Sequence, residues 1–408
     1  MKHHFSRRVA GAKRSAIREL LKLTEQPDII SFGGGLPAPE TFPHEEMAEI
    51  ARELIHNHYE NVLQYGLTEG SKTLRQAVAD WLGPQDVHVT IDQLLVTTAS
   101  QQALDLLCKS FIDPGDVIFC GLPTYLGAVQ AFSLFEADKI GVPLDDDGMN
   151  MNILEERIAE ARAAGKTLKA IYVIPDFQNP SGITMSLEKR TRLLEIAHRE
   201  DLLVFEDNPY GHLRFAGDPL PSLHSMDQDG RVIMLLTFSK TLCAGLRLAV
   251  MVAQGDLMDA LVRAKQPTDL CTSKLTQHLA AQYILQYGLE NHLEDIRPIY
   301  RAKRDAMIEA LEKYMPKNDG LSWTRPDGGL FVWMRLPEEI DATEMLRDAI
   351  EHKVAYVPGA TAYVDGGGQN TLRLAFSLAT PETIDEGIQR LAKVVKAAIE
   401  SKTPAGAR

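Results

Sequence analysis

Lys240 lies in a run of residues whose types suit the chemistry of an activated amine. The run reads Thr237-Phe-Ser-Lys240-Thr-Leu-Cys-Ala-Gly-Leu-Arg247. A partly buried lysine near a second cation has a lowered pKa, so it becomes a nucleophile that can form a Schiff base with an aldehyde. Thr237, Ser239 and Arg247 suit a phosphate, the arginine as a bidentate fork and the hydroxyls as neutral donors. The alternative for this run alone is a solvated lysine at the end of a strand.

Asp207 supplies a second group that the same chemistry needs. The apolar run Leu202-Leu-Val-Phe-Glu-Asp207 ends in this acid, and open α/β sheets bind their ligands at the carboxyl ends of strands. A buried carboxylate would keep a pyridine nitrogen protonated, which pyridoxal phosphate requires as an electron sink. The alternative is a helix cap or turn aspartate, because Asn208-Pro209 follows. With Lys240, Asp207 indicates a site for pyridoxal phosphate.

Three more polar side chains suit the same cofactor. Tyr210 and Asn179 offer a hydroxyl and an amide to the phenolic oxygen of the ring, although each also suits an ordinary turn. Ser100 follows the strand Gln93-Leu-Leu-Val-Thr and opens an apolar-periodic helix, so it stands at a helix N-terminus, where anions bind. The alternative for Ser100 is an N-cap without a ligand.

Together these segments resemble fold-type I pyridoxal-phosphate aminotransferases. The likeness is greatest to the group that contains 2-aminoadipate, kynurenine, aromatic and alanine-glyoxylate aminotransferases, and it covers nearly the whole chain. The further segments that carry it are Ser15-Ala-Ile-Arg18-Glu-Leu-Leu-Lys-Leu-Thr, Ser31-Phe-Gly-Gly-Gly35-Leu-Pro-Ala-Pro-Glu, Gln64-Tyr65-Gly and Asn370-Thr-Leu-Arg373-Leu.

The resemblance implies a role for each matching position. Lys240 is then the catalytic residue, as Schiff-base lysine and proton shuttle. Arg373 takes the α-carboxylate of the substrate, which Gly35 approaches with its backbone, and Arg18 pairs with a distal carboxylate or swings away from an apolar side chain. The alternative for Arg18 is a solvated helix arginine. The implied cofactor-binding residues are Ser100, Gln101, Gln102, Tyr125, Asn179, Asp207, Tyr210, Thr237, Ser239, Lys240, Arg247 and, from a neighbouring subunit, Tyr65; the implied substrate-binding residues are Ser15, Arg18, Gly35, Tyr65, Asn179 and Arg373.

The middle of the chain alternates short apolar runs with helical patterns, which predicts an α/β domain with a mostly parallel sheet flanked by helices. After about Glu290 the pattern predicts a smaller α+β domain with a long helix at Leu293–Tyr314. We expect a large cofactor-binding domain at 55–290 and a small domain formed by 1–54 and 291–408. The seven predicted strands are Leu94–Thr97, Val117–Cys120, Lys139–Val142, Ala170–Ile174, Leu202–Glu206, Val232–Thr237 and Leu248–Val252; the helices between them include Gln102–Phe111, Met151–Ala164 and Leu187–Glu200.

Composition narrows the class of protein. A formal charge of −13 over 408 residues argues against nucleic acid or an acidic membrane as partner. The chain has no apolar run of 18 residues and its polar start lacks a signal-peptide core, so we expect a cytoplasmic protein. The histidines and the four isolated cysteines show no metal-ligand spacing, so no metal is implied. Asp145–Gly148 is expected to be a strand-to-helix turn, and no GxGxxG fingerprint supports a dehydrogenase.

Three functions remain open at this stage. The favoured one is a ping-pong aminotransferase that moves an amino group from 2-aminoadipate, aromatic or long aliphatic amino acids to 2-oxoglutarate. The second keeps the scaffold and changes the chemistry, as a pyridoxal-phosphate lyase or an alanine-glyoxylate-type aminotransferase. The third is a transcription regulator with an aminotransferase-like domain, which is disfavoured because the family pattern begins by Ser15 and the net charge is negative. Tyr65 serves the phosphate only from the opposite subunit in the resembling group, so a homodimer with shared active sites is expected.

Overall fold

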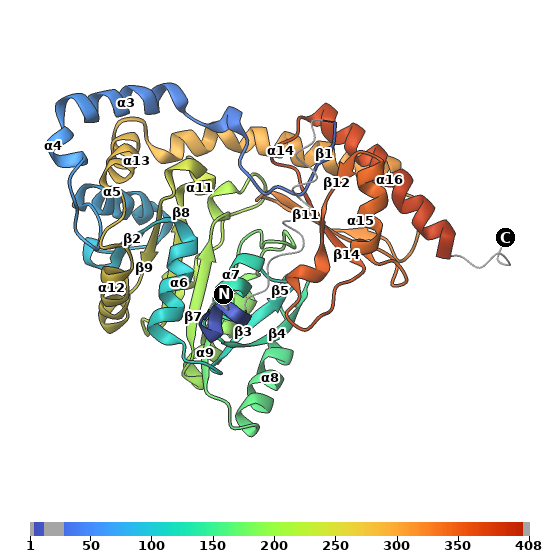
Figure 1. The fold of residues 1–408 in the computed structure, drawn as a ribbon, viewed down its shortest axis with the longest axis horizontal. Coiled ribbons are helices and arrows are strands. Elements are labelled where there is room, and N and C mark those ends of the chain that lie inside the picture. The colour runs from blue at the N-terminus through green and yellow to red at the C-terminus, as the bar shows by residue number, and fades with distance from the viewer. Residues whose placement is uncertain (1–3, 12–27, 403–408) are drawn as a thin grey trace.

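The structure is a computed structural model that describes residues 4–11 and 28–402 (Figure 1). Its centre is an eight-stranded sheet in the order β2-β9-β8-β7-β6-β3-β4-β5. The five strands from β8 to β4 in this order are parallel to one another. Strand β9 is antiparallel to both β2 and β8, and β5 is antiparallel to β4. The strands are β2 (Leu94–Thr97), β3 (Val117–Leu122), β4 (Asp138–Asp145), β5 (Gly148–Met149), β6 (Leu168–Val173), β7 (Leu203–Asn208), β8 (Val232–Thr237) and β9 (Ala249–Val252).

The prediction of an α/β fold with a large, mostly parallel sheet is confirmed, and each of the seven predicted strands overlaps one of these strands. The eighth strand, β5, was not predicted. The turn at Asp145–Gly148 therefore joins two strands, and the prediction that it leads from a strand directly into a helix is wrong. Gly148 has a φ of 115°, a left-handed conformation that glycine adopts without steric cost, so the chain can reverse here.

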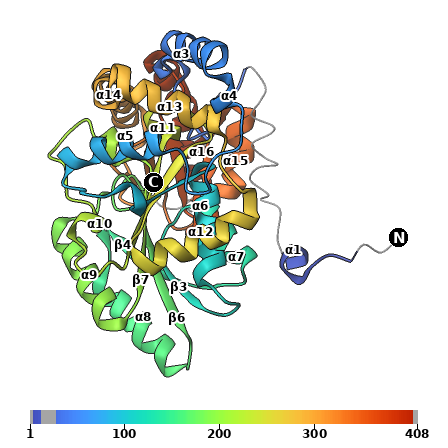
Figure 2. The same ribbon diagram turned by 90° about the vertical axis from the view of Figure 1, so that its left-hand side faces the viewer.

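Helices cover both faces of the large sheet (Figure 2). One face packs on α8 and α9, and an apolar cluster that includes Phe119, Leu154 and Leu193 fills the space between them. The other face packs on α6, which contacts β8 and β9. Because both faces are buried, the strands need continuous apolar runs, which explains why they were predictable. The helices near the sheet are α6 (Ala99–Phe111), α7 (Leu126–Leu134), α8 (Met151–Ala163), α9 (Leu187–Glu200), α10 (Leu223–Met226), α11 (Phe238–Thr241) and α12 (Gly255–Asp269).

A second, antiparallel sheet has the order β10-β11-β14-β13 and lies to the right in Figure 1. Its strands are β10 (Ser322–Trp323), β11 (Phe331–Arg335), β13 (Val357–Pro358) and β14 (Thr371–Ala375). The helices on this side are α14 (Leu289–Tyr314), α15 (Ala342–Glu351) and α16 (Pro381–Lys402). Trp333 of β11 and Val357 of β13 both lie opposite Arg373 of β14, so the three side chains share one face of the sheet.

The N-terminal part of the chain joins both regions. Strand β1 (Ile30–Ser31) pairs in parallel with β12 (Val354–Ala355) near the C-terminal elements. Helix α3 (His44–Asn57) continues through the predicted domain boundary at 54/55. Both this boundary and the one at 290/291 stay predictions. No described helix is both long and apolar enough to cross a membrane. The remaining helices are α1 (Arg7–Gly11), α3 (His44–Asn57), α4 (Tyr59–Val62), α5 (Lys72–Leu82) and α13 (Lys274–Tyr287).

Candidate active site

A cavity of about 200 Å³ lies at the carboxyl ends of β2, β3, β6, β7 and β8. These ends meet at one edge of the sheet, because β3, β6, β7 and β8 are parallel and β2 regains their direction through two antiparallel pairings. The cavity brings together every predicted cofactor-binding residue except Gln102 and Tyr65. Its lining is Leu36, Ala99, Ser100, Gln101, Tyr125, Ile174, Asn179, Asp207, Pro209, Tyr210, Thr237, Ser239, Lys240, Ala244 and Arg247.

Lys240 projects into this cavity from α11, the short helix that follows β8. Its Nζ donates a hydrogen bond to the carbonyl of Gly35 at 2.7 Å. Burial, together with the positive charges of Arg373 and Arg247, lowers the pKa of Lys240 to about 8. The amine therefore loses its proton more readily than an ordinary lysine, as a nucleophile must.

Asp207 is 2% exposed and stands near the end of β7. Its Oδ2 accepts a hydrogen bond from the hydroxyl of Tyr172 at 2.8 Å, and its Oδ1 has no hydrogen-bond partner among the described residues. Burial raises the pKa of Asp207, the hydrogen bond from Tyr172 offsets part of that rise, and the resulting pKa is about 6. A buried carboxylate oxygen left without a donor calls for an explanation, and a protonated ring nitrogen would supply the missing donor.

Asn179 connects two other predicted residues. Its Nδ2 donates to the hydroxyl of Tyr210 at 3.4 Å, and its Oδ1 accepts from Nη1 of Arg373 at 2.9 Å. Arg373 also donates from Nη2 to the carbonyl of Gly33 at 2.7 Å, and its guanidinium lies over the Phe331 ring at 4.4 Å from the centroid. Hydrogen bonds and stacking therefore hold the guanidinium of Arg373 in one orientation.

Hydroxyl and guanidinium donors also line the cavity. Ser100 lies at the N-terminus of α6, and its buried Oγ has no partner within the described part of the chain. Thr237 caps α11 by accepting from the backbone N–H of Ser239 at 3.1 Å. Arg247 also lines the cavity, and its backbone has the left-handed conformation, with a φ of 49°. Such a set of donors suits an anion with several oxygens.

Two predicted cofactor-binding residues, Gln102 and Tyr65, lie outside this cavity. Gln102 does not line the cavity, because its side-chain carbonyl accepts from the N–H of Thr98 and its amide donates to Asp269 at 2.7 Å. Tyr65 is 76% exposed and is not part of the lining. Ser15 and Arg18 lie outside the described residues.

Sequence reasoning missed several residues at the site. Tyr172 was hidden inside the apolar strand β6, where a tyrosine is an ordinary core residue, and its hydroxyl was the only available signal. Phe331 contacts Arg373 and Tyr210, and its ring fills the space beside Gly35, where a Cβ would come within 2.5 Å of it. Ala99 has a φ of 61°, which is unusual for a residue with a side chain and carries no sequence signal.

Comparison with known proteins assigns this arrangement to a family. The model of the family described as aminotransferase class I and II matches residues 27–391. The chain belongs to this family. It is 46% identical to aromatic-amino-acid aminotransferase 1 of Thermococcus litoralis, over 96% of this chain and 94% of the relative. It is also 42% identical to the 2-aminoadipate transaminase of Thermus thermophilus, over 96% of both chains.

A solved structure gives the same result. The kynurenine aminotransferase of Pyrococcus horikoshii superimposes with a TM-score of 0.93 and 44% identity, covering 98% of both chains. The protein is thus a fold-type I, pyridoxal-phosphate-dependent aminotransferase, and the lyase alternative is not supported. The cavity fits this cofactor, because Asp207 Oδ1 and Ser100 Oγ are buried polar atoms without partners in the described chain.

We expect the pKa of Lys240 to rise when Arg373 is replaced. Arg373→Gln removes one of the two cations that disfavour the protonated amine, so the midpoint should move upward from about 8. The midpoint is measured in the cofactor-stripped protein as the pH dependence of reductive methylation at Lys240, followed by peptide mass spectrometry. Arg347→Gln, at an exposed position of α15, is the control. An unchanged midpoint in Arg373→Gln would contradict the electrostatic account.

Proposed function

We propose that this aminotransferase moves an amino group from 2-aminoadipate, aromatic or long aliphatic amino acids to 2-oxoglutarate by a ping-pong mechanism. The observation that carries the proposal is the placement of Lys240, whose amine has a lowered pKa, in one cavity with Asp207 and the phosphate-type donors. Arg373 adjoins this cavity through its hydrogen bond to Asn179, where it can fix the α-carboxylate that every amino acid carries.

Pyridoxal phosphate, when bound, supplies the aldehyde that takes up the amino group and the ring that delocalises the electrons released at Cα. Lys240 would hold the cofactor covalently until the amino acid displaces it. The released amine of Lys240 would then carry the proton from Cα to the carbon of the former aldehyde. Arg373 would orient the Cα–H bond by binding the α-carboxylate. The residues proposed to hold the phosphate are Ser100, Gln101, Thr237, Ser239 and Arg247.

Asp207, Asn179, Tyr210 and Tyr125 would contact the ring. The free Oδ1 of Asp207 would accept the hydrogen bond of the ring nitrogen. Burial raises the pKa of Tyr210 above its usual value, so its hydroxyl stays protonated and can donate, together with Asn179, to the phenolic oxygen. Tyr125 stands at the N-cap of α7 and lines the cavity, where a flat aromatic ring suits stacking on the cofactor.

A second cavity of about 180 Å³ supports apolar and aromatic donors. It shares Tyr125 and Asn179 with the cofactor cavity and is also lined by Arg373. The rest of its lining is mostly apolar and includes Trp333, Val357 and Pro358. A large side chain can bury its surface there at roughly 25 cal/mol per Å². The aromatic, aminoadipate and kynurenine aminotransferases among the relatives act on donors of the proposed kinds.

A homodimer would complete the site with Tyr65 of the partner subunit. Tyr65 lies among exposed apolar residues on and after α4, with Leu63 62% and Leu67 52% exposed. Contiguous apolar surface of this kind marks protein interfaces. Because Tyr65 does not line the cavity of its own chain, it can serve the phosphate only from the second copy.

We also propose that the reaction takes place in the cytoplasm. All four cysteines, Cys108, Cys120, Cys243 and Cys271, are free thiols, as expected in a reducing compartment. The net charge of −13 is consistent with small-molecule substrates as the partners.

We expect the purified protein to absorb visible light through a cofactor linked to Lys240. Borohydride should fix the linkage to Lys240, and peptide mass spectrometry identifies the modified lysine. Lys240→Ala should lose the reducible linkage and turnover, because Lys240 is the only lysine among the described residues that line the cavity. Lys313→Ala, at an exposed position of α14, is the control. Stoichiometric transfer to 2-oxoglutarate separates amino transfer from lyase chemistry, and an unlabelled Lys240 would refute the assignment.

Mixing two inactive variants tests the shared site. Tyr65→Ala and Lys240→Ala homodimers should each have low activity. After subunit exchange, the mixed dimer has one site that combines an intact Lys240 with the intact Tyr65 of the other chain. Activity should therefore appear on mixing. Steady-state assays measure this activity, and light scattering measures whether the protein is a dimer. If Tyr65 acted within its own chain, no site of the mixed dimer would be complete and no activity would appear.

Arg18 lies outside the described residues. We propose that it binds the distal carboxylate of an acidic substrate. A charge-assisted pair contributes about 1.5 to 3 kcal/mol, so Arg18→Ala should lower kcat/KM for 2-aminoadipate by about tenfold to a hundredfold. Phenylalanine should be affected far less, because it offers no charge at that end. A donor panel with 2-oxoglutarate as acceptor measures both values. Equal losses for the two donors would reject this role and leave amino transfer intact.

A further inference from the structure

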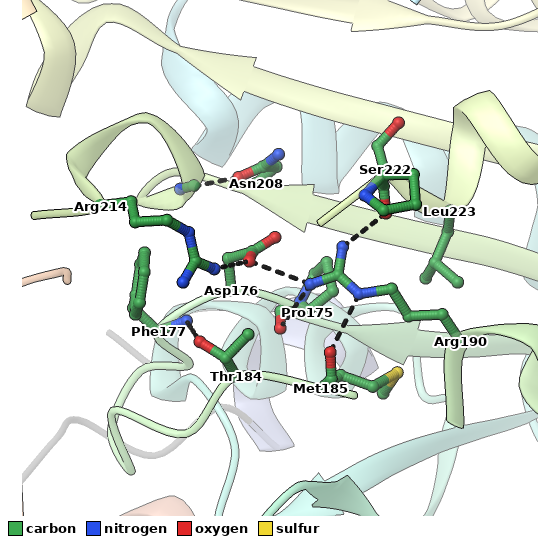
Figure 3. Close-up of polar contacts among 12 residues, drawn as sticks. Pro175, Asp176, Phe177, Thr184, Met185, Arg190, Asn208, Arg214, Ser222 and Leu223 are labelled. Atoms are coloured by element: carbon green, nitrogen blue, oxygen red, sulfur yellow. Dashed lines mark hydrogen bonds and ion pairs between the residues drawn. The ribbon is translucent and has the colours of Figure 1, made fainter. Parts of the chain in front are cut away.

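Asp176 is a buried carboxylate that the proposed chemistry does not use. It is 5% exposed and lies in the segment 175–185, which carries Asn179 between β6 and α9. Its Oδ1 forms an ion pair with Nη2 of Arg190 at 2.9 Å and accepts a hydrogen bond from Nη2 of Arg214 at 3.0 Å, so one oxygen contacts two arginines (Figure 3). Asp176 does not line the cofactor cavity.

Arg190 of α9 holds the base of this segment. It is fully buried, and its Nε donates to the carbonyl of Met185 at 3.0 Å while Nη2 donates to the carbonyl of Pro175 at 3.3 Å. Pro175 and Met185 are the two ends of the segment, and they also bond directly, because Met185 N–H donates to Pro175 at 2.7 Å. A third bond runs from Nη1 to the carbonyl of Pro221 at 2.8 Å. The orientation of Arg190 therefore sets where the Asn179 segment begins and ends.

Arg214 lies four residues after Tyr210 and connects that turn to the second sheet. Its backbone forms an antiparallel bridge with Gly328, three residues before Phe331. Its guanidinium lies over the ring of Phe177 at 4.6 Å from the centroid. A Cβ at Gly328 would come within 2.3 Å of that ring and 2.6 Å of the backbone carbonyl oxygen of Leu213, so only glycine allows this close approach. Three segments therefore meet at Arg214.

These three segments carry the groups around the proposed phenolic-oxygen site. The first carries Asn179, the second carries Tyr210, and the third leads into Phe331, on which Arg373 stacks. The bond between Asn179 and Tyr210 measures 3.4 Å, at the long end of the range for hydrogen bonds, so a small shift of either segment breaks it. Removing the shared carboxylate would leave two arginines, one of them fully buried, without their common counter-charge.

We propose that Asp176 is a positioning residue for amino transfer: by joining Arg190 to Arg214, it sets Asn179 relative to Tyr210 and thereby the hydrogen bonds to the phenolic oxygen of the cofactor. This proposal rests on the roles proposed above for Asn179 and Tyr210. Asp176 itself touches neither the cofactor nor the substrate. Its effect is on geometry, so it should appear in the spectrum of the holoenzyme as well as in turnover.

Asp176→Asn in the holoenzyme tests this proposal. The variant keeps the shape of the side chain and removes the charge. Hydrogen bonds to the phenolic oxygen would stabilise its negative charge. That charge would then stabilise a proton on the nitrogen of the lysine linkage less, so the pKa of the linkage would be lower. Loosening these hydrogen bonds should therefore raise the midpoint of the pH titration of the visible band, by about half a unit or more. Displaced reacting groups should lower kcat by about tenfold to a hundredfold, with a smaller change in KM.

Glu155→Gln is a matched control. Glu155 of α8 also bridges two arginines, Arg192 and Arg199 of α9, at 2.5 and 2.6 Å, but on the surface and away from the cavity. It should leave both the titration midpoint and kcat unchanged. Arg214→Gln removes the ion pair between Arg214 and Asp176 and keeps the one between Arg190 and Asp176. It should have the same effects as Asp176→Asn, and it provides the test if Asp176→Asn does not fold.

Two results would overturn the proposal. One is a wild-type titration midpoint and wild-type kcat in Asp176→Asn or Arg214→Gln, even with a lower thermal midpoint, because Asp176 would then be a structural ion pair only. The other is an equal shift in Glu155→Gln. Failure of the proposed function is distinguishable, because wild type and Glu155→Gln would themselves lack the visible band or amino transfer.

Discussion

Burial of charged groups at the carboxyl edge of the large sheet is the constraint on which the active site depends. Water is largely excluded there, so the pKa of Asp207 rises to about 6 and that of Lys240 falls to about 8. At a pH between these values the carboxylate is ionised, and the amine is mostly protonated but loses its proton more readily than an ordinary lysine. The fold creates this situation by ending parallel strands at one edge, where each strand contributes a different polar group.

The sheet could be predicted because burial on both faces demands continuous apolar runs. The predicted strand Val232–Thr237 has the bounds of β8, and Leu187–Glu200 has those of α9. By contrast, β5 has two residues, too few to show any periodicity. The end of β7 was placed too early, because pairing with β8 extends the strand through Asn208. Such boundaries depend on a neighbouring strand that is distant in sequence.

The grouping of the candidate site residues in one cavity was predictable where they belong to local motifs, as around Lys240 and Asp207. It was not predictable where contacts join distant segments. Tyr172 lies 35 residues from Asp207, and Asp176 lies 38 residues from Arg214. Gln102 shows the converse case, a residue that local sequence groups with the site but that does not line the cavity. It stands next to predicted phosphate ligands in sequence, but the turn of the helix directs its amide toward Asp269 of α12.

In the proposed site, the second cavity has one part for the group that all amino acids share and another for the side chain that distinguishes them. Arg373, held by Asn179 and Gly33, suits the invariant carboxylate, whereas Trp333, Val357 and Pro358 form the apolar wall from β11 and β13. None of these three wall residues lines the cavity that contains Lys240 and Asp207. Substitutions in the wall can therefore accumulate without disturbing the groups that perform the chemistry. This modularity makes the scaffold evolvable, since the preferred donor can drift while the reaction is retained.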